Sequence, residues 1–223
     1  MEKEPKQTKD ITYFRYPGEA NTVAVLMAAK KRCHELGGRK VILASETGRS
    51  AISALEIFQG CETRLVVVTH LPGKTGGPLG EIPVGLYAPE YASILHALLE
   101  AGVEVIQSRP VDPTSERATA RKASTTALVA QTLDLFGAGV KVAIEASLVA
   151  ADAQAVAEGE EIIACAGTYM GLDTALLISA AKRKNFFQDF EILEYIAKPR
   201  SRLKKLPAYE QADWKGSLDK YYA

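Results

Sequence analysis

The chain has 223 residues with equal numbers of basic and acidic side chains, 27 of each, so its formal charge is zero. This length can bury a substantial core in one large or two small domains, and the balanced charge excludes a general attraction to nucleic acid or to an anionic membrane. No apolar run reaches the ~18 residues of a transmembrane helix, and the charged N-terminal segment MEKEPKQTKD is unlike a signal peptide.

The three cysteines are too widely spaced to predict a disulfide framework or a metal site, and we expect a cytoplasmic protein. Residues 1–10 are expected to be disordered, and residues 11–16 predict a first strand. A helix is predicted from about residue 19 to residue 36, where two glycines end it.

Residues 41–58, VILASETGRSAISALEIF, are the most informative segment of the chain. The apolar run at 41–44 predicts a buried parallel strand, and an amphipathic helix follows the polar loop at 45–50. Such a strand–loop–helix unit leaves unpaired backbone N–H groups at the positive end of the helix dipole.

A phosphate group suits that loop, because it combines hydroxyls, a glycine that lets the backbone come close and a guanidinium fork. The residues concerned are Ser45, Thr47, Gly48, Arg49 and Ser50. The alternative is an ordinary helix start with Ser50 or Thr47 as its N-cap.

The next elements alternate in the same way along the chain. A strand is predicted at 65–69, a long Gly- and Pro-rich loop at 71–87, a helix at 89–101 and a strand at 103–107. Loops of that length are usually functional or mobile.

The last third predicts a long helix followed by β structure. The helix is expected at 115–136 and the strands at 140–144, 161–166, 175–178 and 190–196, with a hairpin between the second and third. Residues 148–157 could form a short helix, and the tail at 201–223 could cover the surface or a neighbouring subunit of a homo-oligomer.

The alternation of strands and helices predicts a single α/β domain over residues 11–200. We expect three layers, α/β/α, around a mostly parallel sheet with antiparallel additions. Its core strands should be 41–44, 65–68, 103–106 and 140–144.

In an open parallel sheet, ligands bind outside the carboxyl ends of the strands, where several polar loops should meet. His70 could act there as an acid or base, or could be structural. Glu145 interrupts an apolar run and needs a partner, either a ligand or an arginine. Asp173 could bond a ligand or cap its own turn. Further candidates at this edge are Asn21, Thr69, Gly167, Thr168 and Thr174.

The segment at 41–58, followed by LVVVTH, resembles the C-terminal α/β domain of pyruvate kinase, and more closely the stand-alone proteins built on that domain. The ordered motifs that carry the resemblance are YF…PG..NT at 13–22, GVKVAIE at 139–145, AADA at 150–153, GTYMGLDTA at 167–175, NFF at 185–187 and AKPR at 197–200. Together they cover roughly residues 11–200.

The resemblance implies the fold of that domain and a phosphorylated ligand, flavin mononucleotide (FMN) in the stand-alone family. The FMN phosphate would bind at residues 47–50 and its ring would extend toward 168–174. The family usually has a basic residue where this chain has Tyr169 and Met170, a change that favours a flat ring over a second phosphate.

The chain is too short to contain the catalytic barrel of a pyruvate kinase, so we expect a binding protein rather than that enzyme. A flavin-dependent oxidoreductase and a sugar-phosphate-binding regulatory protein are the alternatives. A structural subunit without a ligand is a third, which the intact loop at 47–50 argues against.

Overall fold

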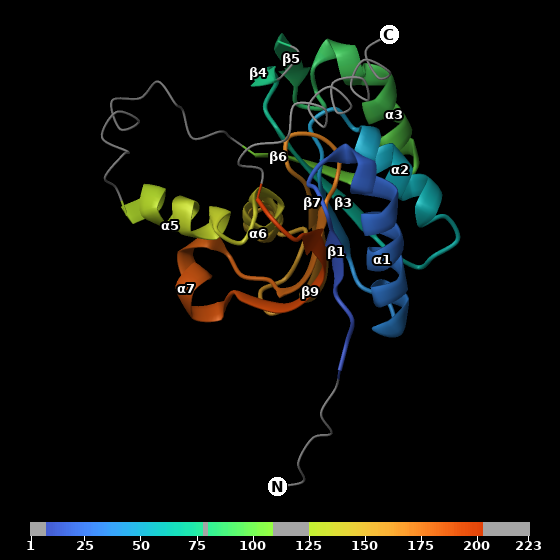
Figure 1. Ribbon diagram of the computed structural model, residues 1–223. Coiled ribbons are helices and arrows are strands. Elements are labelled where there is room, and N and C mark those ends of the chain that lie inside the picture. The colour runs from blue at the N-terminus through green and yellow to red at the C-terminus, as the bar shows by residue number, and fades with distance from the viewer. Residues whose placement is uncertain (1–7, 78–79, 109–124, 203–223) are drawn as a thin grey trace, which may run out of the picture.

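The computed structural model describes residues 8–77, 80–108 and 125–202, and its centre is a seven-stranded sheet in the order β1-β9-β8-β7-β2-β3-β6 (Figure 1). β2 runs parallel to β3 and β7, and β3 runs parallel to β6. β8 is antiparallel to both of its neighbours, and β1 is parallel to β9. The strands are β1 (Thr12–Phe14), β2 (Val41–Ala44), β3 (Leu65–His70), β6 (Glu104–Ser108), β7 (Glu161–Ala166), β8 (Thr174–Ser179) and β9 (Glu191–Pro199).

Helices cover both faces of this sheet, which confirms the expected three layers (Figure 1). One face packs against α1, α2 and α3, and the other packs against α6 with α5 and α7 beyond it. The helical elements are η1 (Glu19–Asn21), α1 (Thr22–Glu35), α2 (Arg49–Ile57), η2 (Pro89–Tyr91), α3 (Ala92–Glu100), α5 (Thr125–Asp134), α6 (Ala138–Asp152), η4 (Arg183–Asn185) and α7 (Phe186–Asp189).

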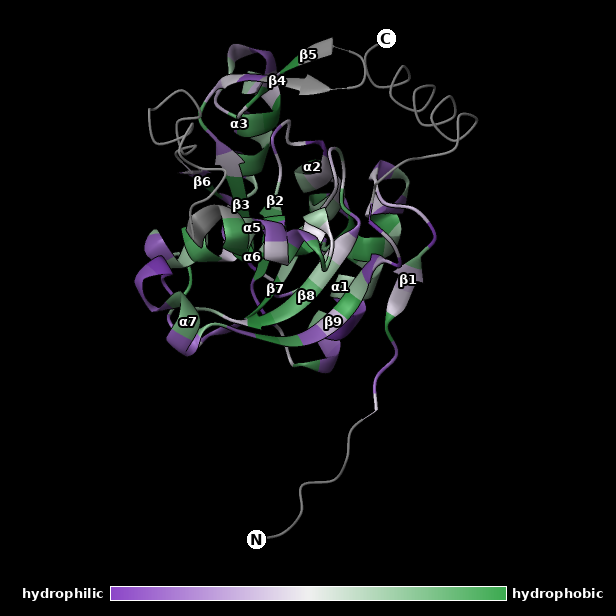
Figure 2. Ribbon diagram, turned by 60° about the vertical axis from the view of Figure 1, so that its left-hand side comes forward, coloured by the Kyte–Doolittle hydropathy of each residue, from purple (hydrophilic) through white to green (hydrophobic). Residues whose placement is uncertain are grey.

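The central strands are apolar on both faces, as their continuous hydrophobic runs predict (Figure 2). In β2, Val41 and Leu43 face α1 and α2, whereas Ile42 faces α6. Because side chains alternate across a strand, each central strand contributes to both halves of the core. The hairpin expected between 161–166 and 175–178 is confirmed as the antiparallel pair β7–β8.

The prediction of a strand at 140–144 is wrong, because these residues belong to α6. This helix buries Val140, Ala143, Ile144, Ser147 and Ala151, at the three- and four-residue spacing of a helical face. The apolar run therefore reflects a helix covered by the sheet, and a run of this length does not distinguish a buried helix from a buried strand. The short helix expected at 148–157 is the second half of α6 as far as Asp152.

The long loop expected at 71–87 contains a separate two-stranded hairpin, β4 (Gly73–Gly77) and β5 (Gly80–Val84). Its strands are not part of the main sheet. Three expectations lie wholly or partly outside the described residues: disorder at 1–10, the helix at 115–136, which is seen as α5, and the tail at 201–223.

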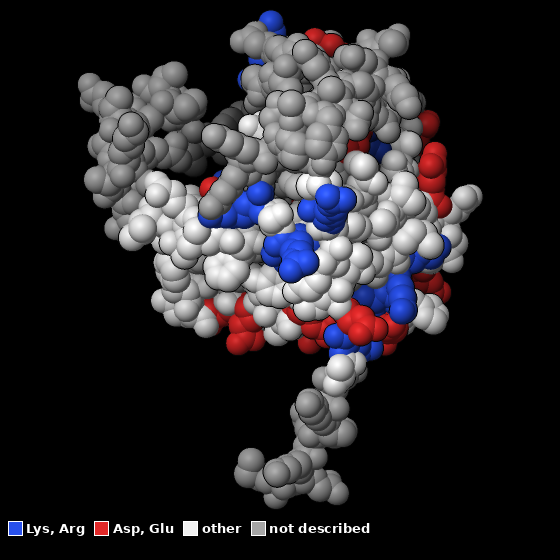
Figure 3. All heavy atoms as spheres, in the orientation of Figure 1, with Lys and Arg blue, Asp and Glu red and all other residues white. Residues whose placement is uncertain are grey.

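Within the described ranges, no helix is both long and apolar enough to cross a membrane. Figure 3 shows basic side chains near the centre of one face of the molecule and acidic side chains along its lower edge. This face therefore carries charges of both signs, in agreement with the zero formal charge.

Candidate functional site

A cavity of about 220 Å³ opens at the carboxyl ends of β2, β3 and β7. From β2 the chain continues to β3 and β6 on one side of the sheet, and later to β7 and β8 on the other. The cavity therefore lies where the order of the strands reverses, the usual position of a ligand site in an open α/β sheet.

The loop after β2 turns sharply into α2 at Gly48, which has a φ of +80°. A Cβ at Gly48 would lie 2.6 Å from Leu86 Cδ2 and would overlap Ile94. Gly48 is therefore required by the turn and by packing against the neighbouring chain, rather than by the approach of a ligand. No side chain within the described residues caps the start of α2, so neither Thr47 nor Ser50 is its N-cap.

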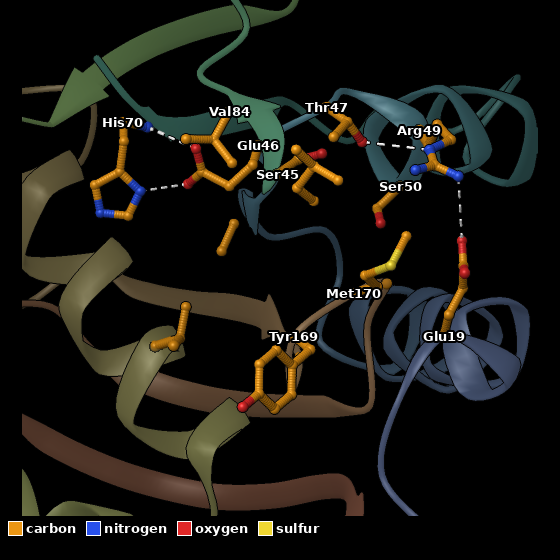
Figure 4. A pocket seen from close by; sticks show the side chains of 15 residues that line it. Glu19, Ser45, Glu46, Thr47, Arg49, Ser50, His70, Val84, Tyr169 and Met170 are labelled. Atoms are coloured by element: carbon orange, nitrogen blue, oxygen red, sulfur yellow. Dashed lines mark hydrogen bonds and ion pairs between the residues drawn. The ribbon is translucent and has the colours of Figure 1, made fainter. Parts of the chain in front are cut away.

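Two residues next to this helix start form an ion pair at one side of the cavity (Figure 4). Arg49 Nη1 lies 3.9 Å from Glu19 Oε1, and Arg49 Nε donates a long hydrogen bond of 3.4 Å to Thr47 Oγ1. Burial raises the pKa of the Glu19 carboxyl, and the charge of Arg49 opposes this shift. The cavity therefore contains a carboxylate beside its main cationic group.

A second carboxylate, that of Glu46, binds His70 on the opposite side of the cavity (Figure 4). Glu46 Oε1 lies 2.5 Å from His70 Nδ1, and Glu46 Oε2 accepts a hydrogen bond of 3.2 Å from the backbone N–H of His70. The carboxylate thereby holds a proton on Nδ1 and fixes the orientation of the imidazole. The Glu46 hydrogen bond raises the pKa of His70, burial of the ring opposes the shift, and Glu145 adds to it.

We expect His70 to titrate above the ordinary imidazole pKa of ~6.5, and Glu46→Gln to lower its pKa. Because the folded-state pKa is raised, this pair stabilises the fold fully below the unfolded-state pKa, and the contribution is lost as the pH rises through the folded-state pKa. A titration of the imidazole NMR signals measures the shift. His96, on α3 outside the cavity, provides a control signal that should not respond to Glu46→Gln. The same His70 pKa in both proteins would contradict the assignment.

The loop after β7 forms the remaining wall of the cavity, with Tyr169 and Met170 beside the opening (Figure 4). Tyr169 has a φ of +63° and is 70% exposed, a conformation that is uncommon for a bulky residue. Gly167 and Gly171 close the loop tightly, since a Cβ on Gly167 would overlap the carbonyl oxygen of Gly171. An aromatic face and a thioether are thus held at the mouth of the cavity.

Asp173 lies behind this wall and does not line the cavity. Its fully buried carboxylate accepts hydrogen bonds from the N–H groups of Gly18 (2.9 Å) and Thr168 (3.0 Å) and from the hydroxyl of Thr174 (2.8 Å). Asp173 and Thr174 therefore lie outside the lining and bond to each other and to neighbouring loops, and their contact with a ligand stays a prediction. Burial raises the pKa of the Asp173 carboxyl, and its hydrogen bonds oppose the shift.

Two further candidates have structural contacts outside the cavity lining, and a third, Glu145, lies on the surface of a helix. Asn21 Nδ2 donates to the carbonyl oxygens of Tyr16 and Gly18. The Thr69 hydroxyl accepts from the N–H of Leu86. Glu145 is exposed on α6 rather than buried in a strand, because the segment that contains it is helical.

The structure thus brings together about half of the candidates that the sequence indicated. Those that line the cavity are Ser45, Thr47, Arg49, Ser50, His70 and Gly167. Those that do not are Asn21, Gly48, Thr69, Glu145, Thr168, Asp173 and Thr174. Glu19 and Glu46 were missed, although Glu46 lies in the polar loop at 45–50 and Glu19 lies two positions before the candidate Asn21.

Among the residues that the structure describes, no group of His, Cys, Asp and Glu side chains could hold a metal ion. No protein-family model matches the chain. The chemistry of the cavity itself is therefore the main guide to function.

Proposed function

We propose that the cavity binds a phosphorylated small molecule, with its phosphate at the start of α2. The observation that carries this proposal is that the uncapped start of α2 adjoins a cavity lined by Thr47, Arg49 and Ser50. A phosphate there would accept hydrogen bonds from these side chains and from the first N–H groups of the helix.

Several properties of this helix start suit an anion. α2 is nine residues long, so the positive end of its dipole adds to the charge of Arg49. The hydroxyls of Ser45 and Ser50 belong to largely buried residues in the lining, where a hydrogen bond to a charged oxygen is little weakened by water.

We propose FMN as the first ligand to test, and the similarity to stand-alone relatives of the pyruvate kinase C-terminal domain supports this choice. Thr47, Arg49 and Ser50 would hold its phosphate, and Tyr169 and Met170 offer apolar surface to its ring. When bound, FMN would supply redox chemistry, which is the basis of the alternative that the protein is a flavin-dependent oxidoreductase.

The size of the cavity favours a second candidate, a sugar phosphate. About 220 Å³ is less than the ~300–1,000 Å³ typical of pockets that enclose drug-sized ligands. A flavin ring would therefore remain at the mouth, whereas a sugar phosphate is small enough to lie inside. A visible absorption band in the purified protein would distinguish flavin from a sugar phosphate.

Arg49→Ala is expected to weaken FMN binding by roughly 1.5–3 kcal/mol, the scale of a charge-assisted hydrogen bond. Ser50→Ala should cost less, because it removes one neutral hydroxyl. Fluorescence titration of FMN into each variant measures the change. Arg64→Ala is a matched control, since Arg64 is an exposed arginine paired with Glu104 on another part of the surface.

Riboflavin, which lacks the phosphate, provides the decisive comparison. Wild-type protein should bind FMN more tightly than riboflavin, and Arg49→Ala should reduce that preference. Equal affinity of the wild-type protein for the two compounds would refute the phosphate site.

A further inference from the structure

The Glu19 carboxylate is an unexpected neighbour for a phosphate group. It lines the same cavity as Arg49, and its side chain is only 13% exposed. Its Oε1 lies 3.9 Å from Arg49 Nη1, whereas its Oε2 is fully buried and accepts no hydrogen bond from the described residues. A buried carboxylate oxygen without a donor is costly, so a ligand that donates to it would stabilise the site.

The backbone holds Glu19 in this position. A Cβ on Gly171 would lie 2.5 Å from the Glu19 Cα, so the loop after β7 packs directly on η1. The preceding residue, Gly18, donates its N–H to the buried Asp173 carboxylate. The start of η1 is therefore anchored, which fixes the backbone from which the Glu19 side chain reaches the start of α2.

Among the described residues that line the cavity, this carboxylate has one cationic neighbour. Arg49 of α2 is that neighbour, and Figure 4 shows Glu46 and His70 paired with each other on the opposite side. The Asp173 carboxylate lies on the other side of Gly18, whose N–H binds it, and so it does not neutralise Glu19. A fully ionised phosphate at Arg49 would thus face the negative charge of Glu19 at close range, which opposes binding.

We propose that Glu19 makes the site selective for a phosphate group that carries a proton. The P–O–H group donates to the Glu19 carboxylate, while Arg49 and the N–H groups of α2 bind the other phosphate oxygens. The complex holds one proton between the phosphate and Glu19, and no bond to carbon or phosphorus is made or broken. This inference rests on the proposed function, because it requires a phosphate at the start of α2.

Selectivity against sulfate follows directly from this arrangement. Phosphate esters have a second pKa of ~6, so a fraction of the molecules still carries a proton near neutral pH. Sulfate has the same shape but carries no proton under these conditions, so it repels the ionised Glu19 carboxylate unless Glu19 itself takes up a proton. A hydrogen-bonded carboxylate at an anion site therefore discriminates by protonation rather than by size.

Calorimetric titration of inorganic phosphate and inorganic sulfate into the full chain, at pH 6 and pH 8, tests the proposal. Wild-type protein should bind phosphate at least about tenfold more tightly than sulfate at pH 6. Phosphate binding should weaken as the pH rises, by up to about tenfold per unit, because the complex keeps a proton that both free partners lose. Glu19→Gln should tighten sulfate binding, bring the two anions within about threefold of each other and flatten the pH dependence.

Glu104→Gln is the matched control, because Glu104 pairs with Arg64 away from the cavity and its loss should leave the phosphate-to-sulfate ratio unchanged. Thermal unfolding of each variant shows that it is folded, and Glu19→Ala gives a second test of the same carboxylate. Equal binding of the two anions to wild-type protein, or a ratio unaltered by both Glu19 variants, would overturn the role of Glu19. Arg49-dependent phosphate binding would then still uphold the proposed function, whereas no phosphate binding to wild-type protein would overturn both.

Discussion

Asp173→Ala is expected to lower the free energy of unfolding by about 3–5 kcal/mol, because it leaves two buried backbone N–H groups and a hydroxyl without their acceptor. The carboxylate joins three segments: the turn at Gly18, the loop at Thr168 and the start of β8 at Thr174. For a chain of this size, such a loss corresponds to a fall in melting temperature of roughly 10 °C or more. Chemical denaturation of the ligand-free protein measures it.

Asp152→Ala provides the control for this substitution. Asp152 also accepts a backbone hydrogen bond and forms an ion pair, both with Arg183, but its side chain is 35% exposed. Water can replace these contacts, so we expect Asp152→Ala to lower the free energy of unfolding by less than about 1 kcal/mol. An Asp173→Ala protein with unaltered stability and lost ligand binding would instead restore the role in ligand contact that the sequence suggests.

Gly139→Ala is expected to destabilise the protein by about 3–4 kcal/mol, although Ala is favoured over Gly in a helix by ~1 kcal/mol. A Cβ at Gly139 would lie 2.5 Å from Asp173 Oδ1 and would overlap the Thr174 side chain. Both of these side chains are short and fully buried, so neither can move aside without losing its hydrogen bonds. Thermal and urea unfolding measure the effect.

The control for Gly139 is a glycine with room for a methyl group. At Gly73 an added Cβ would meet no atom of the described residues closer than 3.8 Å, so Gly73→Ala should be nearly neutral. A Gly139→Ala protein as stable as wild type would show that α6 can shift away from β8 at little cost. That outcome would weaken the assignment of Asp173 as the centre of a rigid structural cluster.

Much of the sheet could be predicted from local sequence. The runs at 41–44 and 65–69 are rich in apolar, β-branched residues, and polar loops end them. Their composition therefore predicts buried strands of a parallel sheet. Thr47, Arg49, Ser50 and His70 were placed at one edge because each follows such a strand, and the carboxyl ends of parallel strands meet.

Local sequence failed at 140–144, where a helix occupies the position expected for a strand. Val140 and Ile144 are β-branched, and four of the five residues, all except Lys141, are apolar because α6 is covered by the sheet. Local propensity is weak compared with burial against a neighbouring layer, so only the tertiary structure decides between the two conformations. The exposure of Glu145 follows from that choice.

The tertiary structure also decided which polar residues face the cavity. Asp173 is bound by Gly18, which lies 155 positions earlier in the chain, and Glu19 meets Arg49 only because η1 packs on the loop after β7. The sequence determined that hydroxyls, an arginine and a histidine would gather at the carboxyl edge of the sheet. Which of them are buried as structural acceptors and which remain open to a ligand depends on contacts between distant segments, and local periodicity carries no information about these contacts.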